Sequence, residues 1–186
     1  MVKVGFICEG DTDKIIVESQ KFKDLLKDNS LQFVKAENAR GKYNLEPGKI
    51  QPFINNLLDE KAEVIIILTD LDDDINVTKT KERINAPEGM IVIVAKQEVE
   101  AWFLADSNML SKWFKKNFEF EYPELESDPR QVLKNLSLIN TGRGIWSSKP
   151  KFANSMINNG FSILNAAAHP NCSSAKYFIN KLQTIN

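Results

Sequence analysis

Acidic residues cluster at one point in this chain, directly after an apolar run. Residues 65–68 are all apolar, and Thr69 leads from them into four carboxylates within five positions. These carboxylates are Asp70, Asp72, Asp73 and Asp74. So many negative charges repel one another unless a divalent cation or solvent compensates them. The cluster therefore indicates either a metal site or a strongly solvated turn.

Further acidic residues follow two other apolar runs. Glu9 comes directly after residues 2–8, and Glu98 and Glu100 come shortly after residues 90–95. Carboxylate oxygens suit Mg²⁺ or Mn²⁺. Glu98 and Glu100 cannot both face one way on a helix, and we favour Glu100 as a metal ligand. Gly10, next to Glu9, would let the backbone approach the site closely.

The elements that must position these residues alternate along the first half of the chain. Strands are predicted at residues 2–8, 31–36, 63–69 and 90–95, with helices at 13–27, from near Pro47 to about 60, and at 76–84. From residue 97 onward the chain shows helical segments at 98–105, 107–118, 129–138, 151–158, 162–168 and 173–182. The predicted fold class is α/β, with a mainly parallel four-stranded sheet flanked by helices and a helical C-terminal extension. Groups at the carboxyl ends of parallel strands can converge, so the acidic residues are expected to meet there.

The composition limits the possible functions but does not identify one. The chain has 186 residues, 42% of them apolar, which is enough for one sizeable core. A net charge of −1 and a pI near 6.0 provide no overall attraction to nucleic acid or anionic membranes, so binding to either would need a local basic patch. We expect a cytoplasmic protein with no membrane partner, because neither a signal pattern nor a membrane-length apolar segment is present.

Two short motifs carry a resemblance to a known domain. Glu9-Gly10-x-Thr12-Asp13 after the first predicted strand, with Asp70-x-Asp72 after the third, resembles the Toprim domain shared by topoisomerases, primases and the OLD family of nucleases. More narrowly, residues 98–106 (EVEAWFLAD) resemble a signature of small stand-alone Toprim-like proteins that are often linked to phage defence. The resemblance implies a Toprim/Rossmann-like domain at residues 1–106 and a helical extension at 107–186 packed on the same domain.

The resemblance also implies roles for individual residues. Glu9 would act as a general acid/base or a metal ligand, and Asp70 and Asp72 would form the metal-binding pair. Asp74 matches a further acidic position in some Toprim proteins, and Glu100 matches the narrower group. The implied cofactor is Mg²⁺ or Mn²⁺, and in OLD-type nucleases one or two such ions serve phosphodiester hydrolysis.

A partner is implied as well, because OLD-type enzymes usually carry an ATPase half. The pair Gly48-Lys49 does not fit a phosphate-binding loop, since Tyr43 stands where that loop needs glycine and Ile50 where it needs Ser or Thr. A separate partner ATPase is therefore one expectation. A homodimer is another, because the last helix carries Tyr177, which could bury against the domain or against a second copy.

Basic and glycine-rich segments offer candidate contacts to phosphate. Arg143 and Gly144, with Gly10, could bind phosphate, and Lys149 or Lys151 could stabilise charge on a phosphoryl group in the transition state. A glycine turn with solvated lysines explains the same residues equally well. The basic loop at residues 40–42 has the same two interpretations.

Three classes of function remain open at this point. The first is a metal-dependent phosphotransfer enzyme, most simply a nuclease that hydrolyses DNA or RNA and acts in phage defence. The second is a different enzyme with an acidic Asp-x-Asp pair, such as a phosphatase or a nucleotidyl enzyme. The third is a binding module that keeps the acidic pocket but acts through a partner protein without catalysis.

Overall fold

A four-stranded parallel sheet carries the acidic cluster. The computed structural model describes residues 1–145 and 148–185. Within them β1 (Val2–Cys8), β2 (Leu31–Asn38), β3 (Val64–Asp70) and β4 (Ile91–Ala95) pair in the order β2-β1-β3-β4, all parallel. The predicted fold class is therefore confirmed, and the carboxyl ends of all four strands lie at one edge of the sheet.

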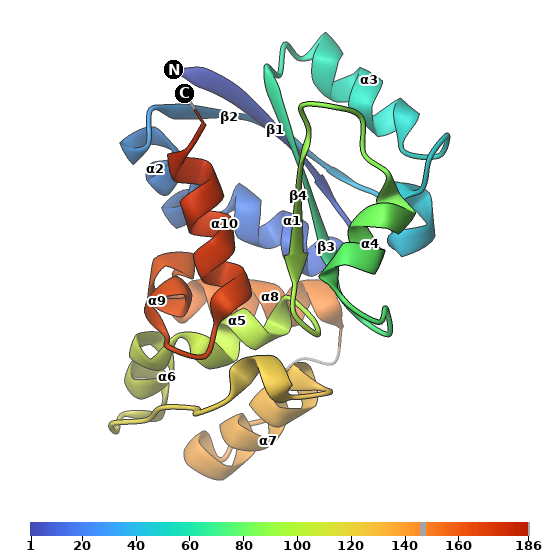
Figure 1. Ribbon diagram of the computed structural model, residues 1–186. Coiled ribbons are helices and arrows are strands. Elements are labelled where there is room, and N and C mark those ends of the chain that lie inside the picture. The colour runs from blue at the N-terminus through green and yellow to red at the C-terminus, as the bar shows by residue number, and fades with distance from the viewer. Residues whose placement is uncertain (146–147, 186) are drawn as a thin grey trace.

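Helices cover both faces of this sheet (Figure 1). One face is covered by α3 (Gln51–Asp59) and α4 (Val77–Ile84), and the other by α1 (Asp11–Glu18), α2 (Gln20–Asp28) and α10 (Ser173–Gln183). Successive side chains of a strand point to opposite faces, so each strand supplies two cores. Phe6 and Ile66 enter the core under α1, α2 and α10, whereas Ile7 and Ile67 enter the core under α3 and α4.

The second half of the chain adds helices below the sheet in Figure 1. They are α5 (Glu100–Ala105), α6 (Ser107–Phe114), α7 (Pro129–Thr141), α8 (Lys149–Asn158) and α9 (Ile163–Ala168), with short 3-10 turns at Lys42–Leu45 and Pro123–Leu125. Phe178 of α10 joins them to the sheet, since its ring lies 5.7 Å from that of Phe22 and 5.9 Å from that of Trp102. The helical half thus shares a core with the sheet, and a boundary at residue 106 stays a prediction.

Three predicted helices have different bounds in the structure. The single helix predicted at residues 13–27 is two helices, because Ser19 is extended and its hydroxyl accepts a hydrogen bond from the amide of Phe22, which caps the second one. The helix predicted near Pro47 begins later, at Gln51. The helix predicted to reach residue 118 ends at Phe114, because Lys115 adopts a left-handed conformation with φ 55°.

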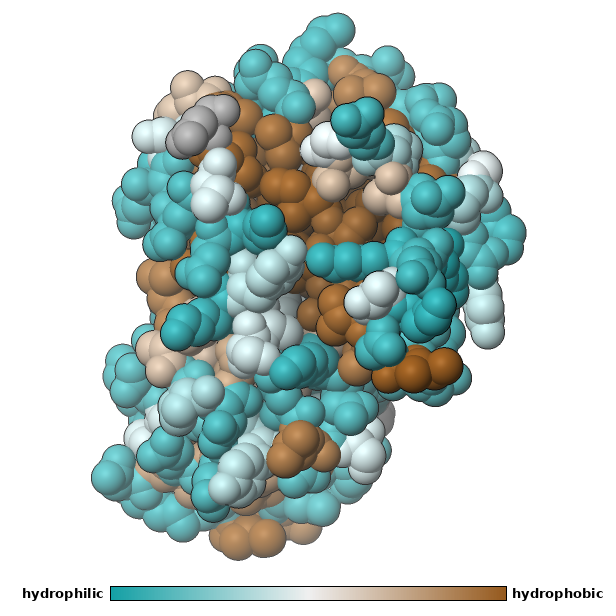
Figure 2. Space-filling model, viewed as in Figure 1, coloured by the Kyte–Doolittle hydropathy of each residue, from teal (hydrophilic) through white to brown (hydrophobic). Residues whose placement is uncertain are grey.

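The strand β4 forms one edge of the sheet and is less covered than its neighbours. Ile91 and Val92 are only partly buried. In the same view, Figure 2 shows apolar surface over this strand between α10 and α4, while most of the surrounding surface is hydrophilic. Among the described residues, no helix has both the length and the apolar character needed to cross a bilayer.

The shared core predicts that the C-terminal helix is needed for stability. Phe178→Ala should lower the free energy of unfolding by about 3–5 kcal/mol, because it empties a fully buried ring site between α2 and α5. Chemical denaturation measures this change. Ile139→Ala is the control, since that side chain is 78% exposed and its loss should cost less than about 0.5 kcal/mol. Equal small effects would contradict the shared core.

Candidate acidic site at the carboxyl end of the sheet

A pocket of about 350 Å³ opens where the strands end and α1, α5 and α8 begin. Its lining includes the five carboxylates of Glu9, Asp11, Asp13, Asp70 and Glu100 and the two cations Arg40 and Lys149. The parallel order explains this convergence, because Glu9 follows β1, Arg40 follows β2 and Asp70 ends β3.

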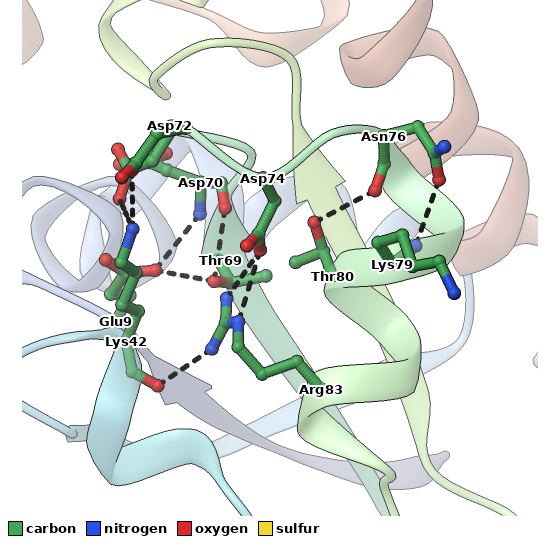
Figure 3. A network of polar contacts seen from close by, with 11 residues as sticks. Glu9, Lys42, Thr69, Asp70, Asp72, Asp74, Asn76, Lys79, Thr80 and Arg83 are labelled. Atoms are coloured by element: carbon green, nitrogen blue, oxygen red, sulfur yellow. Dashed lines mark hydrogen bonds and ion pairs between the residues drawn. The ribbon is translucent and has the colours of Figure 1, made fainter.

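Glu9 is held at the end of β1 by its neighbour β3. Its amide donates to the carbonyl of Leu68 at 2.9 Å, which continues the strand pairing by one residue. Its Oε2 accepts hydrogen bonds from the Thr69 hydroxyl at 2.5 Å and from the Asp70 amide at 3.3 Å (Figure 3). Burial raises the pKa of Glu9; the hydrogen bond from Thr69 opposes that rise and the Asp72 carboxylate adds to it.

Asp70 is the last residue of β3 and is almost fully buried. Its Oδ1 accepts a hydrogen bond of 2.8 Å from the amide of Val99, just before α5. Burial raises the pKa of Asp70 well above its usual range, and the carboxylates of Asp13, Glu100 and Glu9 raise it further. The hydrogen bond between Asp70 and Val99 connects the end of β3 to the start of the helix that carries Glu100.

Asp13 and Glu100 each have one carboxylate oxygen bound and one without a partner. Asp13 Oδ2 accepts from the Gly10 amide at 2.8 Å, and Glu100 Oε1 accepts from the Thr12 hydroxyl at 2.9 Å. The other oxygens, Asp13 Oδ1 and Glu100 Oε2, are buried and have no hydrogen-bond partner among the described residues. Because burying an unpaired polar atom costs free energy, these two oxygens are suited to bind a cation or a proton.

Charge in the pocket is out of balance. Burial raises the pKa of Asp13 well above its usual range, with Glu100 and Glu9 adding to the rise. Burial alone would lower the pKa of Lys149, but Glu100, Glu98, Asp70 and Asp13 together raise it, so this amine stays protonated. Lys149 is therefore a positive charge close to several carboxylates of the pocket, although no ion pair joins it to them among the described residues.

The pocket brings together only some of the residues that the sequence singled out. Glu9, Gly10, Asp70, Glu100 and Lys149 all line it. Glu98, the alternative to Glu100, does not line it, so the choice of Glu100 agrees with the geometry.

The other acidic residues after β3 do not line the pocket and form ion pairs instead (Figure 3). Asp72 has a left-handed backbone with φ 47°, and its carboxylate lies 3.5 Å from the Lys42 amine. Asp73 pairs with the same amine at 2.6 Å, and Asp74 pairs with Arg83 at 3.0 Å. The chain turns at Asp72, whose carboxylate still lies close enough to Glu9 to raise the pKa of that residue. Metal ligation by Asp72 and Asp74 stays a prediction.

The residues predicted to contact phosphate lie at different places in the structure, and only some of them line the acidic pocket. Arg143 and Gly144 line a different cavity, and Lys151 lines a shallow hollow on α8 instead of the acidic pocket. Asp13 and Arg40, in contrast, line the pocket, although the sequence analysis gave Asp13 no role of its own and left the basic loop at residues 40–42 with two interpretations. The signal for Asp13 was present, because it closes the motif that begins at Glu9 and lies in the first turn of α1. Arg40 could have been found from its place after β2, the neighbour of β1.

The donor set of the pocket fits a hard divalent cation. Mg²⁺ usually takes one or two carboxylates and completes its shell with water and substrate phosphates. Asp13 Oδ1 and Glu100 Oε2 are oxygens of the right kind with no other partner among the described residues. Within residues 1–145 and 148–185, no three acidic, histidine or cysteine side chains already enclose a metal position.

Fold and pocket together define the class of this protein: an α/β protein with a buried carboxylate pocket at the carboxyl end of a parallel sheet.

No family model matches the chain, and no curated protein matches it. Solved structures with a similar arrangement include the C-terminal region of the Burkholderia pseudomallei OLD protein, with 17% identity and a TM-score of 0.44, covering 99% of this chain and 100% of that one. The C-terminal region of the Xanthomonas campestris pv. campestris OLD protein is similar too, with 15% identity and a TM-score of 0.43, covering 97% and 94%. Likeness at this level does not say which reaction the pocket supports.

The raised pKa values predict an unusual dependence of stability on pH. The folded protein binds protons at Glu9, Asp13 and Asp70 more tightly than the unfolded chain does. The stability that these groups contribute is therefore lost as pH rises through their folded pKa values. With metal removed by a chelator, Asp70→Asn should unfold less easily than the parent at pH 8, by on the order of 1 kcal/mol, and the difference should shrink toward pH 5.

Thermal melting over this pH range in a chelating buffer is the measurement. Asp59→Asn, which changes an exposed carboxylate on α3, is the matched control and should follow the parent at every pH. If the melting temperatures of Asp70→Asn and Asp59→Asn changed with pH in the same way, the pocket would hold no excess of negative charge.

Proposed function

We propose that this protein is a Mg²⁺- or Mn²⁺-dependent nuclease that hydrolyses phosphodiesters. The observation that supports it most directly is that several buried carboxylates share one pocket with Lys149. Two oxygens of these carboxylates have no hydrogen-bond partner among the described residues. A buried excess of negative charge favours a bound divalent cation. The Toprim resemblance of Glu9, Asp70 and Asp72 agrees with the same chemistry.

The pocket residues suggest which side chains would hold the metal. Asp70 and Glu100 are the first choices, with Asp13 beside them, because all three are buried and line the same space. Asp72 would share its carboxylate between the metal and the Lys42 amine, and Asp74 would share its own with Arg83. When bound, such a metal would activate water and offset negative charge on the phosphoryl group.

Glu9 is suited to take the proton from the attacking water. Its pKa is raised by burial, which brings it closer to the pH at which a general base works best. Thr69 and the Asp70 amide both bind Oε2, so the carboxylate is held in one orientation. As the water oxygen bonds to phosphorus, its proton would pass to Glu9, and the bond from phosphorus to the leaving oxygen would break.

Lys149 and Arg40 are suited to hold the phosphate. Both line the pocket, and Lys149 stays protonated beside the carboxylates. Positive charge placed before the reaction stabilises the developing charge on phosphoryl oxygens. Arg40 adds a planar guanidinium that can bind two oxygens at once. Lys149 is preferred to Lys151 because Lys151 lines another hollow.

A partner ATPase and a role in phage defence belong to this proposal as well, and both rest on the Toprim resemblance. A second candidate is a binding module that takes up metal without turnover. It would use the same carboxylate pocket, since a cation can bind there without a reaction following. Such a protein would need a partner to complete its site.

Manganese binding tests the placement of the metal. Titration calorimetry on the parent should show binding, and Asp70→Asn should weaken it by at least about tenfold because a charged ligand is lost. Asp59→Asn is the control, since Asp59 is exposed on α3 outside the pocket, and it should bind like the parent. Weakening by Asp74→Asn as well would extend the site to the turn after β3, and unchanged binding by Asp70→Asn would refute the site.

Cleavage of nucleic acid tests the role of Glu9. With single- and double-stranded DNA and RNA as substrates, Glu9→Gln should lower the cleavage rate by about a hundredfold while metal affinity changes little, because a general base is lost. Equal losses of rate and metal affinity would instead assign Glu9 to the metal. Metal binding by the parent with no cleavage of any substrate would favour the binding module.

A further inference from the structure

A second and larger cavity lies in the helical half of the protein. Its volume is about 780 Å³. Trp113 and Lys115 line it from the end of α6, Arg143 from the loop after α7, and Ser155 and Asn159 from α8 and the residue that follows. Small-molecule sites usually span about 300–1,000 Å³, so this cavity is large enough for a nucleotide unit.

The lining of this cavity is basic. Lys115 and Arg143 are exposed there, and none of the described residues that line the cavity is acidic. Neither cation forms an ion pair with a residue in the described parts of the chain. The acidic pocket at the end of the sheet has the opposite character, so the two sites suit different parts of a ligand.

The charge of the chain is divided in the same sense. All 25 acidic residues lie before Pro129, and the remainder of the chain has no Asp or Glu. That remainder carries Arg130, Lys134, Arg143, Lys149, Lys151, Lys176 and Lys181. The net charge of −1 therefore hides a basic C-terminal part, and this kind of asymmetry is typical of chains that bind polyanions.

Trp113 gives the cavity an aromatic surface. Its ring is half-buried and stacks on Phe114, with centroids 5.0 Å apart and planes 28° apart. Phe114 is fixed in turn by an edge contact with Phe118 at 5.0 Å. An aromatic ring held in place in this way can stack with any nucleic acid base, because every base has a flat π face.

The loop that carries Arg143 is anchored through its backbone. The Ser137 hydroxyl donates to the Arg143 carbonyl at 2.7 Å, and the Arg143 amide donates to the Thr141 hydroxyl at 3.2 Å. Gly142, with φ 68°, ends α7 and directs the chain into this turn. The backbone is thus fixed while the guanidinium remains exposed, as a phosphate contact requires.

Helix α8 connects the two sites. Lys149, its first residue, lines the acidic pocket, and Ser155 and Asn159 line the basic cavity. Lys151 and Asn154 line a hollow that shares Ser155 and Asn159 with the basic cavity. At about 1.5 Å per residue, the distance along the helix from Lys149 is about 9 Å to Ser155 and about 15 Å to Asn159. A stacked strand with about 3.4 Å per nucleotide would span this distance in roughly three or four nucleotides.

We propose that the cavity beside Trp113 and Arg143 binds one nucleotide of a single-stranded nucleic acid whose backbone follows α8 to the acidic pocket. The base stacks on Trp113, and Arg143 and Lys115 contact phosphate. What happens to the strand in the acidic pocket rests on the proposed nuclease function. Binding in the cavity does not, since none of its lining residues belongs to that pocket.

Fluorescence anisotropy with labelled single-stranded DNA and RNA oligonucleotides tests the proposal. A chelator in the buffer prevents metal-dependent cleavage, so the signal reports binding alone. Trp113→Leu should weaken binding by about tenfold or more, because a leucine keeps the contact with Phe114 but cannot stack with a base. Arg143→Ala should weaken binding and reduce the salt dependence of log affinity by about one.

Lys176→Ala is the matched control, since it removes an exposed positive charge on α10 that lines neither site. It should leave affinity nearly unchanged. Equal losses in Arg143→Ala and Lys176→Ala, or parental affinity in both Trp113→Leu and Arg143→Ala, would overturn the proposal. Because Arg143 is exposed, its variant remains informative even if Trp113→Leu folds poorly.

Two further arms separate the sources of the signal. A mononucleotide should compete far less well than the oligonucleotide, and equal competition would overturn the path along α8. Oligonucleotide binding that depends on Trp113 and Arg143, in a protein that binds no manganese, would refute the nuclease while keeping the cavity. Manganese-dependent cleavage with unchanged oligonucleotide affinity in both cavity variants would refute the cavity alone.

Discussion

Excess negative charge at the carboxyl end of the sheet is the constraint on which the rest of this structure depends. Glu9, Asp13, Asp70 and Glu100 all line one pocket, and both Asp13 and Glu100 bury an oxygen without a partner among the described residues. Folding brings these charges together although they repel one another, which costs free energy that other contacts must offset. Hydrogen bonds from Thr12, Thr69 and nearby amides hold each carboxylate in place but do not neutralise it.

The helical half of the chain makes this arrangement complete. Helix α5 supplies Glu100, and α8 supplies Lys149, a cation that lines the same pocket. Both helices are fixed by large aromatic side chains, since Phe103 of α5 and Phe152 of α8 meet with ring centroids 5.9 Å apart and are both fully buried. A sheet with its strand ends alone would therefore lack two of the groups that define the pocket. The core and the site are built by the same elements.

Charge is also separated over a longer distance. The acidic pocket lies at the end of the sheet, whereas the C-terminal part of the chain contains no carboxylate side chain and lines a basic cavity. Helix α8 borders both, with Lys149 at one end and Asn159 just beyond the other. The two sites are too far apart to neutralise each other. An extended polyanion could neutralise the basic cavity at one end and contact the acidic pocket at the other through a bound cation. This separation gives the two proposals a common physical basis.

The sequence by itself determined the class of fold and the edge of the sheet at which acidic residues gather. Apolar runs at strand length with helices between them require a parallel sheet covered on both faces, and the residues after each run must then meet at one edge. This rule placed Glu9, Asp70 and Glu100 together, but it also placed Asp72 and Glu98 there, and neither of these lines the pocket. Sequence alone did not determine which way each side chain points, because a turn such as that at Asp72 redirects the residues beyond it. Only the tertiary structure paired Asp74 with Arg83, brought Asp13 and Arg40 into the pocket, and placed Lys149 there while Arg143 went to a separate cavity. Those outcomes depend on contacts between segments far apart in the chain, which no local pattern records.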